Sequence, residues 1–276
     1  MILAAVVILG SIGLLFGTLI ALANRKLKVW EDPRIDVVNG MLPNANCGAC
    51  GEPGCRAFAE KLVAGAVKPS GCNVATDDAR VQIASYLGVD AGQVVRIGAR
   101  LLCAGGAAVA RQQAEYRGLP TCAAAAAVGG GGKGCTWGCL GLADCVRSCT
   151  FDAMRMSDDG LPLIDLEKCT ACGDCVVACP KDLLAIMPLD QRLLVRCRNL
   201  IAGDGILEDC RVACTTCGKC VVDAAPGLIS IASGVAVVDY RLNALADAAA
   251  IARCPTGAII WLETGSTASL LVGSRS

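Results

Sequence analysis

The stretch that decides the fold is residues 135–179, CTWGCLGLADCVRSCTFDAMRMSDDGLPLIDLEKCTACGDCVVAC, which carries eight cysteines in two runs. The first run has the spacing C-x3-C-x5-C-x3-C, and the second has C-x2-C-x2-C-x3-C followed by Pro180. Between the runs, residues 151–156 and 161–164 flank the turn sequence DDG at 158–160. This pattern predicts a β-hairpin between two cysteine loops.

The second run has the spacing by which bacterial ferredoxins hold [4Fe–4S] clusters, in which the fourth cysteine of each run ligates the other run's cluster. Three thiolates on one tight loop hold three corners of a cubane, and a remote cysteine before a chain-turning proline holds the fourth. The two runs therefore predict two clusters. Cluster 2 is assigned to Cys135, Cys139, Cys145 and Cys179, and cluster 3 to Cys149, Cys169, Cys172 and Cys175.

Zinc is the alternative occupant, because CxxC pairs also form zinc sites. Zinc sites of that kind place cysteines in two pairs separated by a spacer, often with histidine. Here triplets dominate, and the chain contains no histidine. The pattern therefore favours iron–sulfur clusters over zinc.

The composition limits the class of protein. A chain of 276 residues can hold two or three small domains, and with only 3% aromatic residues it can bury little large-side-chain core. Metal clusters must then supply much of the folding energy. The formal net charge is zero and no basic patch with interleaved aromatics occurs, so we expect no nucleic-acid partner. Disulfide scaffolds are usually short secreted chains, so the 20 cysteines indicate reduced thiolates in a reducing compartment.

The N-terminal residues 2–23, ILAAVVILGSIGLLFGTLIALA, contain no charge. At about 1.5 Å per residue, such a helix is about 33 Å long and can cross a hydrocarbon core of about 30 Å. A cleaved signal peptide is the alternative, but no positive residue precedes the run and the run is too long for a signal core. Arg25, Lys26 and Lys28 follow directly, which predicts a cytoplasmic C-terminal side. We expect a single-pass anchor in the cell (inner) membrane, embedded through residues 2–23.

A separate cysteine group follows a polar linker, with the spacing C-x2-C-x4-C-x16-C. Pro53 can open a helix that returns the chain so that the last cysteine closes the site. Four sulfurs with this spacing could hold zinc equally well, but the neighbouring ferredoxin-type runs favour a cluster. Cluster 1 is assigned to Cys47, Cys50, Cys55 and Cys72.

The alanine-rich residues 73–128 are predicted to be helical. Cys103 and Cys122 stand alone in this segment, and Cys197 stands alone further on. Isolated cysteines usually act as small buried hydrophobes, so we expect structural roles for all three.

The cysteine pattern returns in weaker form after residue 190. One complete C-x2-C-x2-C loop is present, but Ala224 stands where its fourth cysteine should fall, and no triplet precedes Cys254. Both losses concern the same cluster, so this module is expected to keep one cluster and to have lost the other. Cluster 4 is assigned to Cys214, Cys217, Cys220 and Cys254, and Cys210 could replace one of them.

Together these features predict an α+β protein with a single transmembrane helix, a small helical four-cysteine domain, a two-cluster ferredoxin-like domain and a degenerate second ferredoxin-like module. The expected domains are the anchor 1–24, the four-cysteine domain 25–90, a helical Ala/Gly-rich linker 91–132, the two-cluster domain 133–190, the degenerate module 191–264 and a tail 265–276.

The order of anchor, four-cysteine group and the segment GCLGLADC at 138–145 resembles the ferredoxin-type iron–sulfur B component of the Rnf electron-transport complex over nearly the whole chain. RLLCAG at 100–105 and YRGLPTC at 116–122 are similar to that family's inter-domain stretch. The resemblance implies one cluster in the four-cysteine domain and two in the central domain. The chain departs from the two-cluster C-terminal module of the longer members at Ala224, Asn243 and residues 246–249.

By the same resemblance, the protein lies on the cytoplasmic face of a membrane complex that couples electron transfer between ferredoxin and NAD to Na⁺ or H⁺ translocation. Its partners would be soluble ferredoxin and the other membrane and peripheral subunits. No GxGxxG follows a predicted strand, so NAD chemistry is expected on a partner and no bond chemistry on this chain alone. Two alternatives remain: a membrane-anchored ferredoxin for another reductase, such as a redox-sensor-reducing system, and a zinc-stabilised scaffold.

Overall fold

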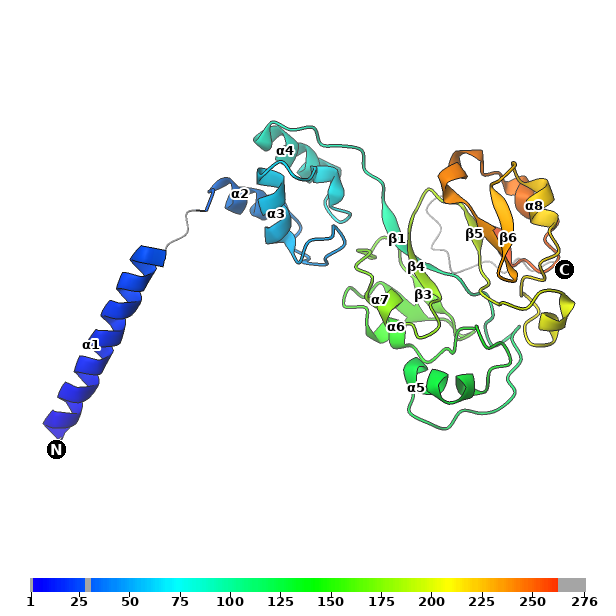
Figure 1. Ribbon diagram of the computed structural model, residues 1–276, viewed down its shortest axis with the longest axis horizontal. Coiled ribbons are helices and arrows are strands. Elements are labelled where there is room, and N and C mark those ends of the chain that lie inside the picture. The colour runs from blue at the N-terminus through cyan, green and yellow to red at the C-terminus, as the bar shows by residue number, and fades with distance from the viewer. Residues whose placement is uncertain (1, 28–30, 263–276) are drawn as a thin grey trace.

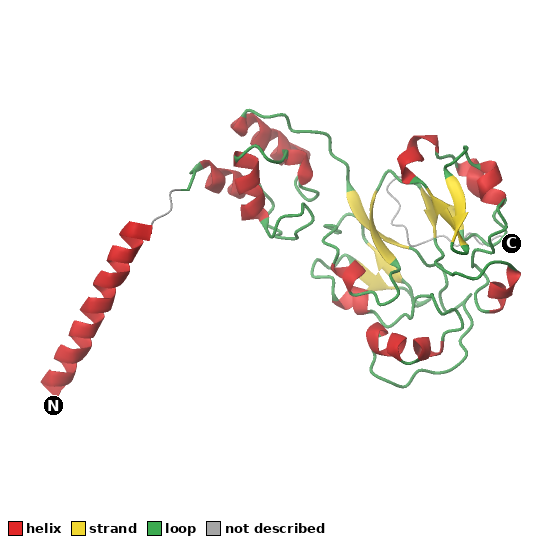
Figure 2. Cartoon of the chain, in the orientation of Figure 1, coloured by secondary structure: helices red, strands yellow, loops and turns green. Residues whose placement is uncertain are grey.

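The structure, a computed structural model, describes residues 2–27 and 31–262, so the predicted tail at 265–276 lies outside the described residues. The chain forms an N-terminal helix, a small helical domain and two units of short strands and helices (Figure 1). Within the described residues, strands occur only after residue 96 (Figure 2). The predicted α+β class is confirmed.

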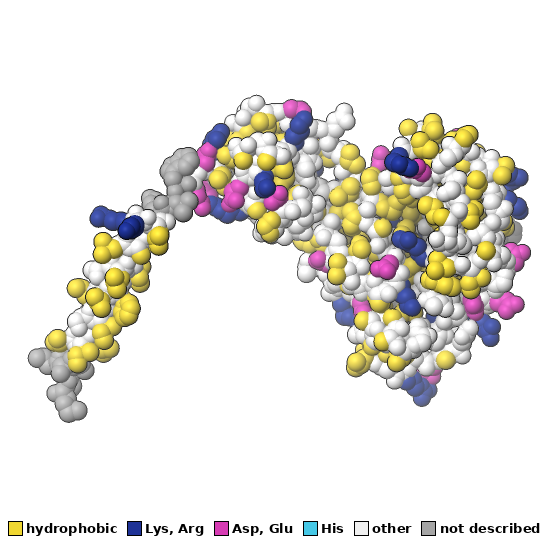
Figure 3. Space-filling view, viewed as in Figure 1, with side chains coloured by type: hydrophobic (Ala, Val, Ile, Leu, Met, Phe, Trp, Pro, Cys, Tyr) yellow, Lys and Arg dark blue, Asp and Glu magenta, His cyan; other side chains and the backbone are white. Residues whose placement is uncertain are grey.

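The helix α1 (Ile2–Leu27) is the long apolar segment. By length and composition, its part Val6–Leu27 could cross a membrane, and none of its most apolar window is buried against the rest of the described chain. Apolar side chains lie along the visible face of this helix, and Arg25 and Lys26 lie in its last turn (Figure 3). This helix coincides with the predicted membrane segment.

The four-cysteine domain packs its helices around the buried side chains of Val38, Phe58 and Ile83. The Thr76 hydroxyl accepts a hydrogen bond from the Ala79 amide and caps one helix, which ends at Gly88 in the left-handed conformation. These caps fix the path of the chain around the cysteines. The elements are α2 (Arg34–Met41), α3 (Cys55–Val63), η1 (Pro69–Gly71) and α4 (Asp77–Leu87).

The central unit is built on two antiparallel strand pairs. The hairpin β2–β3 sets Met154 opposite Ile164, so the predicted hairpin is confirmed. The outer pair β1–β4 sets Leu101 opposite Leu184. The elements are β1 (Ile97–Leu101), α5 (Cys122–Ala127), η2 (Gly129–Gly132), α6 (Asp144–Arg147), β2 (Met154–Met156), β3 (Pro162–Ile164), α7 (Asp174–Val177) and β4 (Leu184–Pro188).

The segment 91–132 differs from the predicted helical linker. It contributes β1 to the central unit, and within it only α5 is an α-helix. Alanine favours helices, but Gly105, Gly106 and Pro120 interrupt the segment, and long-range pairing with β4 holds residues 97–101 extended. Residues 97–101 are therefore joined to the central unit by strand pairing, although they lie in the segment predicted to be a linker.

The C-terminal unit repeats the plan of the central one. A hairpin joins β6 to β7, and an outer pair sets Leu193 of β5 opposite Trp261 of β8. Its core contains Leu193, Leu228 and Ile259. The elements are β5 (Leu193–Val195), η3 (Asp204–Glu208), α8 (Lys219–Asp223), β6 (Ile229–Ala232), β7 (Val235–Val238), η4 (Tyr240–Leu245), η5 (Ala248–Ile251) and β8 (Ile259–Trp261).

Candidate metal centres

All cysteines of the chain lie in the described residues as free thiols, and each lines one of five hollows. Each hollow has four cysteines and measures about 330 to 390 Å³, counting the space open to solvent. We number the hollows to follow the predicted clusters. Site 1 is Cys47, Cys50, Cys55 and Cys72; site 2 is Cys122, Cys139, Cys145 and Cys179; site 3 is Cys149, Cys169, Cys172 and Cys175; site 4 is Cys214, Cys217, Cys220 and Cys254; site 5 is Cys103, Cys135, Cys197 and Cys210.

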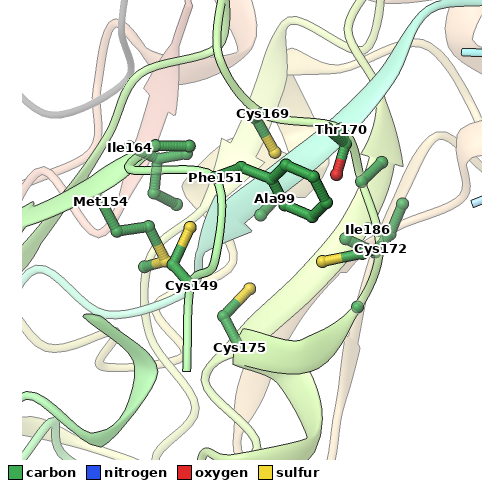
Figure 4. Close-up of a pocket in the computed structure, with 13 residues that line it drawn as sticks. Ala99, Cys149, Phe151, Met154, Ile164, Cys169, Thr170, Cys172, Cys175 and Ile186 are labelled. Atoms are coloured by element: carbon green, nitrogen blue, oxygen red, sulfur yellow. The ribbon is translucent and has the colours of Figure 1, made fainter. Parts of the chain in front are cut away.

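Sites 1, 3 and 4 bring together the same cysteines that the sequence spacing predicts for clusters 1, 3 and 4. At site 3, the four cysteines surround one space that Phe151 and Ile164 close with apolar surface (Figure 4). Cys145 and Cys175 belong to the hydrophobic core of the central unit. The sites are therefore part of the cores of their units.

Three loops with one backbone shape position most of these thiols. In each loop, the residues two and four positions after the first cysteine have positive φ, and a short helix begins at the fifth position. Positive φ is uncommon outside glycine, so its repetition marks a common local fold. The pairs are Gly141 and Ala143 after Cys139, Ala171 and Gly173 after Cys169, and Thr216 and Gly218 after Cys214.

The position of a fourth cysteine is equally regular, because a residue with positive φ follows it three places later. Asp152 follows Cys149 in this way, Asp182 follows Cys179, and Gly257 follows Cys254. Gly227 stands in the same relation to Ala224. The backbone of a fourth-ligand position is thus present at Ala224, and only the thiol is missing.

Site 2 differs from the predicted set for cluster 2, because Cys122 lines it and Cys135 does not. The first loop has the spacing of the other two, but Leu142 stands where they have Cys172 and Cys217. Cys122 is the first residue of α5, and the Asp144 carboxylate accepts a hydrogen bond from the Ala123 amide, which ties α5 to α6. The signal in the sequence was the vacant middle position at Leu142, although nothing local pointed to Cys122.

Site 5 contains the remaining cysteines. The sequence pattern predicts structural roles for Cys103 and Cys197 and places Cys135 in cluster 2. The structure gathers these three and Cys210 around one hollow. No two of them are closer than 13 residues in the sequence, so no local motif marks the group.

Burial largely sets the pKa of the cysteine thiols in the absence of metal. Desolvation raises the pKa of Cys139, Cys145 and Cys175 to about 12. Burial alone would also raise the pKa of Cys254, but hydrogen bonds from the Ile259 and Thr256 amides outweigh it and lower that pKa. Metal binding must replace the thiol protons, so loading these sites releases protons.

The geometry fits clusters better than single ions. In residues 2–27 and 31–262, no three Cys, Asp or Glu side chains are placed to hold one metal ion. A zinc ion at about 2.3 Å from each sulfur needs thiols that converge on one point. Arg100, 4% exposed, has its Nε and one terminal nitrogen without a partner, and its charge interacts with Cys169. A buried cation beside site 3 suits an occupant with net negative charge, such as a cluster held by four thiolates.

The sites adjoin one another in the order 1, 3, 2, 5, 4. Asn73, next to Cys72 of site 1, donates a hydrogen bond of 3.2 Å to the Thr170 carbonyl beside site 3. Helix α6 carries Cys145 of site 2 and is followed by Cys149 of site 3. Helix α7 carries Cys175 of site 3 and is followed by Cys179 of site 2. The amide of Cys139 in site 2 donates to Cys103 Sγ in site 5 at 3.5 Å, and the amide of Cys214 in site 4 donates to Cys197 Sγ in site 5 at 3.4 Å.

Two family models match segments that contain thiols of sites 1, 2 and 3. A family model described as a putative Fe-S cluster matches residues 42–74, and one described as a 4Fe-4S binding domain matches residues 160–181. The chain is 42% identical to the B component of the Na(+)-translocating ferredoxin:NAD(+) oxidoreductase complex of Acetobacterium woodii, over 87% of this chain and 72% of that protein.

Two further relatives align over almost their whole length. The chain is 36% identical to the B component of the proton-translocating ferredoxin:NAD(+) oxidoreductase complex of Clostridium ljungdahlii, over 94% of this chain and 92% of that protein. It is 32% identical to the B component of the ion-translocating oxidoreductase complex of Methanosarcina acetivorans, over 92% and 96%. The sets of four free thiols and these relatives lead to one conclusion: the chain is an iron–sulfur electron-transfer protein that belongs to the B-component family of ion-translocating, Rnf-type oxidoreductase complexes.

Proposed function

We propose that this protein carries electrons between soluble ferredoxin and the NAD(H)-linked subunits of an Rnf-type complex whose electron flow drives Na⁺ or H⁺ translocation. The names of the relatives support the reaction. The observation that carries the proposal is the unbroken succession of four-thiol sites. Each site touches the next through one hydrogen bond or a shared helix.

Three of the proposed ligand sets are those that the sequence spacing predicts, namely those of sites 1, 3 and 4. For cluster 2 we propose Cys122 in place of Cys135, because Cys122 lines the hollow with Cys139, Cys145 and Cys179. When bound, each [4Fe–4S] cluster accepts and releases single electrons. The chain's own groups hold the clusters, exclude water with apolar side chains and supply amide hydrogen bonds to the sulfurs, which tune their potentials.

Membrane association places this relay beside the integral subunits of a complex. We propose that α1 spans the membrane once, with Arg25 and Lys26 at the cytoplasmic end. The cluster-bearing units then lie in the cytoplasm, where they meet soluble ferredoxin. Sodium dodecyl sulfate gels of spheroplasts treated with protease test this orientation, since an outside location would leave the cluster units degraded.

The electron-transfer proposal is tested with full-length holoprotein purified anaerobically in detergent. When reduced soluble ferredoxin is mixed with the protein, the visible absorption of the protein should decrease. The variant Cys172→Ala, which opens site 3, should reduce the number of electrons accepted, whereas Val81→Ala on the exposed face of α4 should match the parent. A parent protein that accepts no electrons from ferredoxin would overturn the proposal.

A further inference from the structure

We propose that Cys103, Cys135, Cys197 and Cys210 bind a fifth [4Fe–4S] cluster, which joins the central unit to the C-terminal unit. The four thiols line one hollow of about 330 Å³, the same volume as site 3. Cys103, Cys135 and Cys210 are each less than 9% exposed. Neither matched family segment, 42–74 nor 160–181, contains any of the four.

Four separate segments deliver these thiols. Cys103 follows β1, and Cys197 follows β5, which occupies the same place in the repeated plan. Cys135 precedes the first cluster loop, and Cys210 follows η3 and forms an isolated bridge with Ala110. Two units with their own cores thus meet at one set of thiols, which is the arrangement expected where a shared group holds them together.

The chain passes close to the thiols of this hollow and directs N–H donors at two of them. A Cβ atom on Gly105 would lie 3.1 Å from Cys210 Sγ and 3.7 Å from Cys103 Sγ, so a larger residue there would crowd the Cys210 thiol. The Gly105 amide donates to Cys103 Sγ at 3.4 Å, and the Asn199 side-chain amide donates to Cys197 Sγ at 3.2 Å. With the amides of Cys139 and Cys214, each of the two sulfurs receives two donors. Such donors favour thiolates over thiols and stabilise a cluster.

Buried positive charge accompanies the thiols. Arg196 lines the hollow at 7% exposure, and its Nε has no partner in the described part of the chain. Its terminal nitrogen donates to the Cys103 carbonyl at 3.2 Å. The half-buried Lys133 also lines the hollow, and its ammonium donates to the Gly105 and Cys139 carbonyls. Two cations against four neutral buried thiols would be costly, whereas a cluster held by four thiolates compensates them.

The position gives this cluster a role in the relay. Site 5 contacts site 2 through the Cys139 amide and site 4 through the Cys214 amide. An electron leaves the reduced cluster of one neighbour, reduces the cluster at site 5 and then passes to the other neighbour, with no bond made or broken. Without a cluster at site 5, electrons would have to pass between sites 2 and 4 with no cluster between them.

Metal analysis of the anaerobically purified full-length protein tests the proposal. The parent should contain about 20 irons and about 20 acid-labile sulfides per chain, four for each of five clusters. The double variant Cys197→Ala/Cys210→Ala should contain about 16 of each, because two thiols cannot hold a cubane. About 16 irons in the parent, unchanged in the double variant, would overturn the fifth cluster, as would one zinc per chain in place of the missing iron.

A milder variant covers the case in which the double variant does not fold. Arg196→Leu should lower the midpoint potential of one cluster in a potentiometric electron paramagnetic resonance titration, because it removes a cation beside site 5. The exposed variant Arg117→Leu, whose side chain lines none of the five hollows, is the control and should shift that potential less. Titrations in which Arg196→Leu shifts no cluster would refute the site. Reduction by ferredoxin at sites 1 to 4 would still stand in that case, so the proposed function and the fifth cluster fail separately.

Discussion

The ligand set of site 2 makes the sharpest prediction, because the first cluster loop lacks its middle cysteine. Leu142 stands where the other two loops carry Cys172 and Cys217, and the backbone around it has the same pattern of positive φ. If Cys122 supplies the missing thiolate from α5, removing it should damage site 2. Placing a cysteine at residue 142 should then restore a ferredoxin-type loop.

The expected magnitude is an iron count. Cys122→Ala leaves three thiolates around the hollow, so one corner of the cubane loses its ligand and the protein should lose between about one and four irons of about 20. The double variant Cys122→Ala/Leu142→Cys should return to the parent value. Iron and acid-labile sulfide are measured on protein purified without oxygen, and visible absorption per chain provides a second reading.

Leu140→Cys is the matched control, because Leu140 also lines the hollow but aligns with Thr170 rather than with a ligand. Combined with Cys122→Ala, it should not restore the iron. Rescue by residue 140 and not by residue 142 would refute the alignment of the loops. Full iron in Cys122→Ala would refute the role of Cys122 and favour the ligand set that the spacing alone predicts, with Cys135.

Three further outcomes are expected. Asn73→Ala removes hydrogen bonds of 2.9 and 3.0 Å to the Ile97 amide and carbonyl and one of 3.2 Å to the Thr170 carbonyl. Docking of the four-cysteine domain should weaken by about 1–3 kcal/mol, which is measured as faster hydrogen exchange at the Ile97 amide. Unchanged exchange would contradict this contact. Gly105→Ala should lower the iron content, because the added methyl group crowds Cys210. Gly205→Ala should leave the iron content unchanged, because the space for its added methyl group is open. Equal iron in both variants would contradict the close approach at Gly105. Deletion of residues 1–24 should release a brown protein with its iron intact from the membrane, and a colourless aggregate would speak against independent cluster units.

Local spacing explains which features the sequence could predict. The thiols of site 3 lie within 27 residues of one another, and a short loop with a fixed spacing can hold three corners of a cluster. The hairpin between β2 and β3 is equally local, since its strands are joined by a DDG turn. In the C-terminal unit, the weakened repeat still marked Ala224 as a vacant position. These features depend on residues that are close together in the sequence, so they can be predicted from one sequence without knowledge of the fold.

Long-range contacts explain what could not be predicted. β1 is a strand because β4 pairs with it 83 residues later, and its own residues do not reveal that partner. Cys122 and Cys135 line different hollows, because α5 brings Cys122 to site 2 while Cys135 lies with Cys210 at site 5. Each lone cysteine resembles a buried small hydrophobe until the fold shows which thiols it meets.

The separation of the site 5 thiols along the chain also sets an order of assembly. Synthesis proceeds from the N-terminus, and all cysteines of sites 1, 2 and 3 have been made once Cys179 is in place. Cys103 and Cys135 must wait until Cys210 has been made and the C-terminal unit has folded onto them. During that interval they are uncovered thiols in a growing polypeptide, open to oxidation. With the proposed cluster at site 5, the junction between the two units is therefore the last part of the central region to mature.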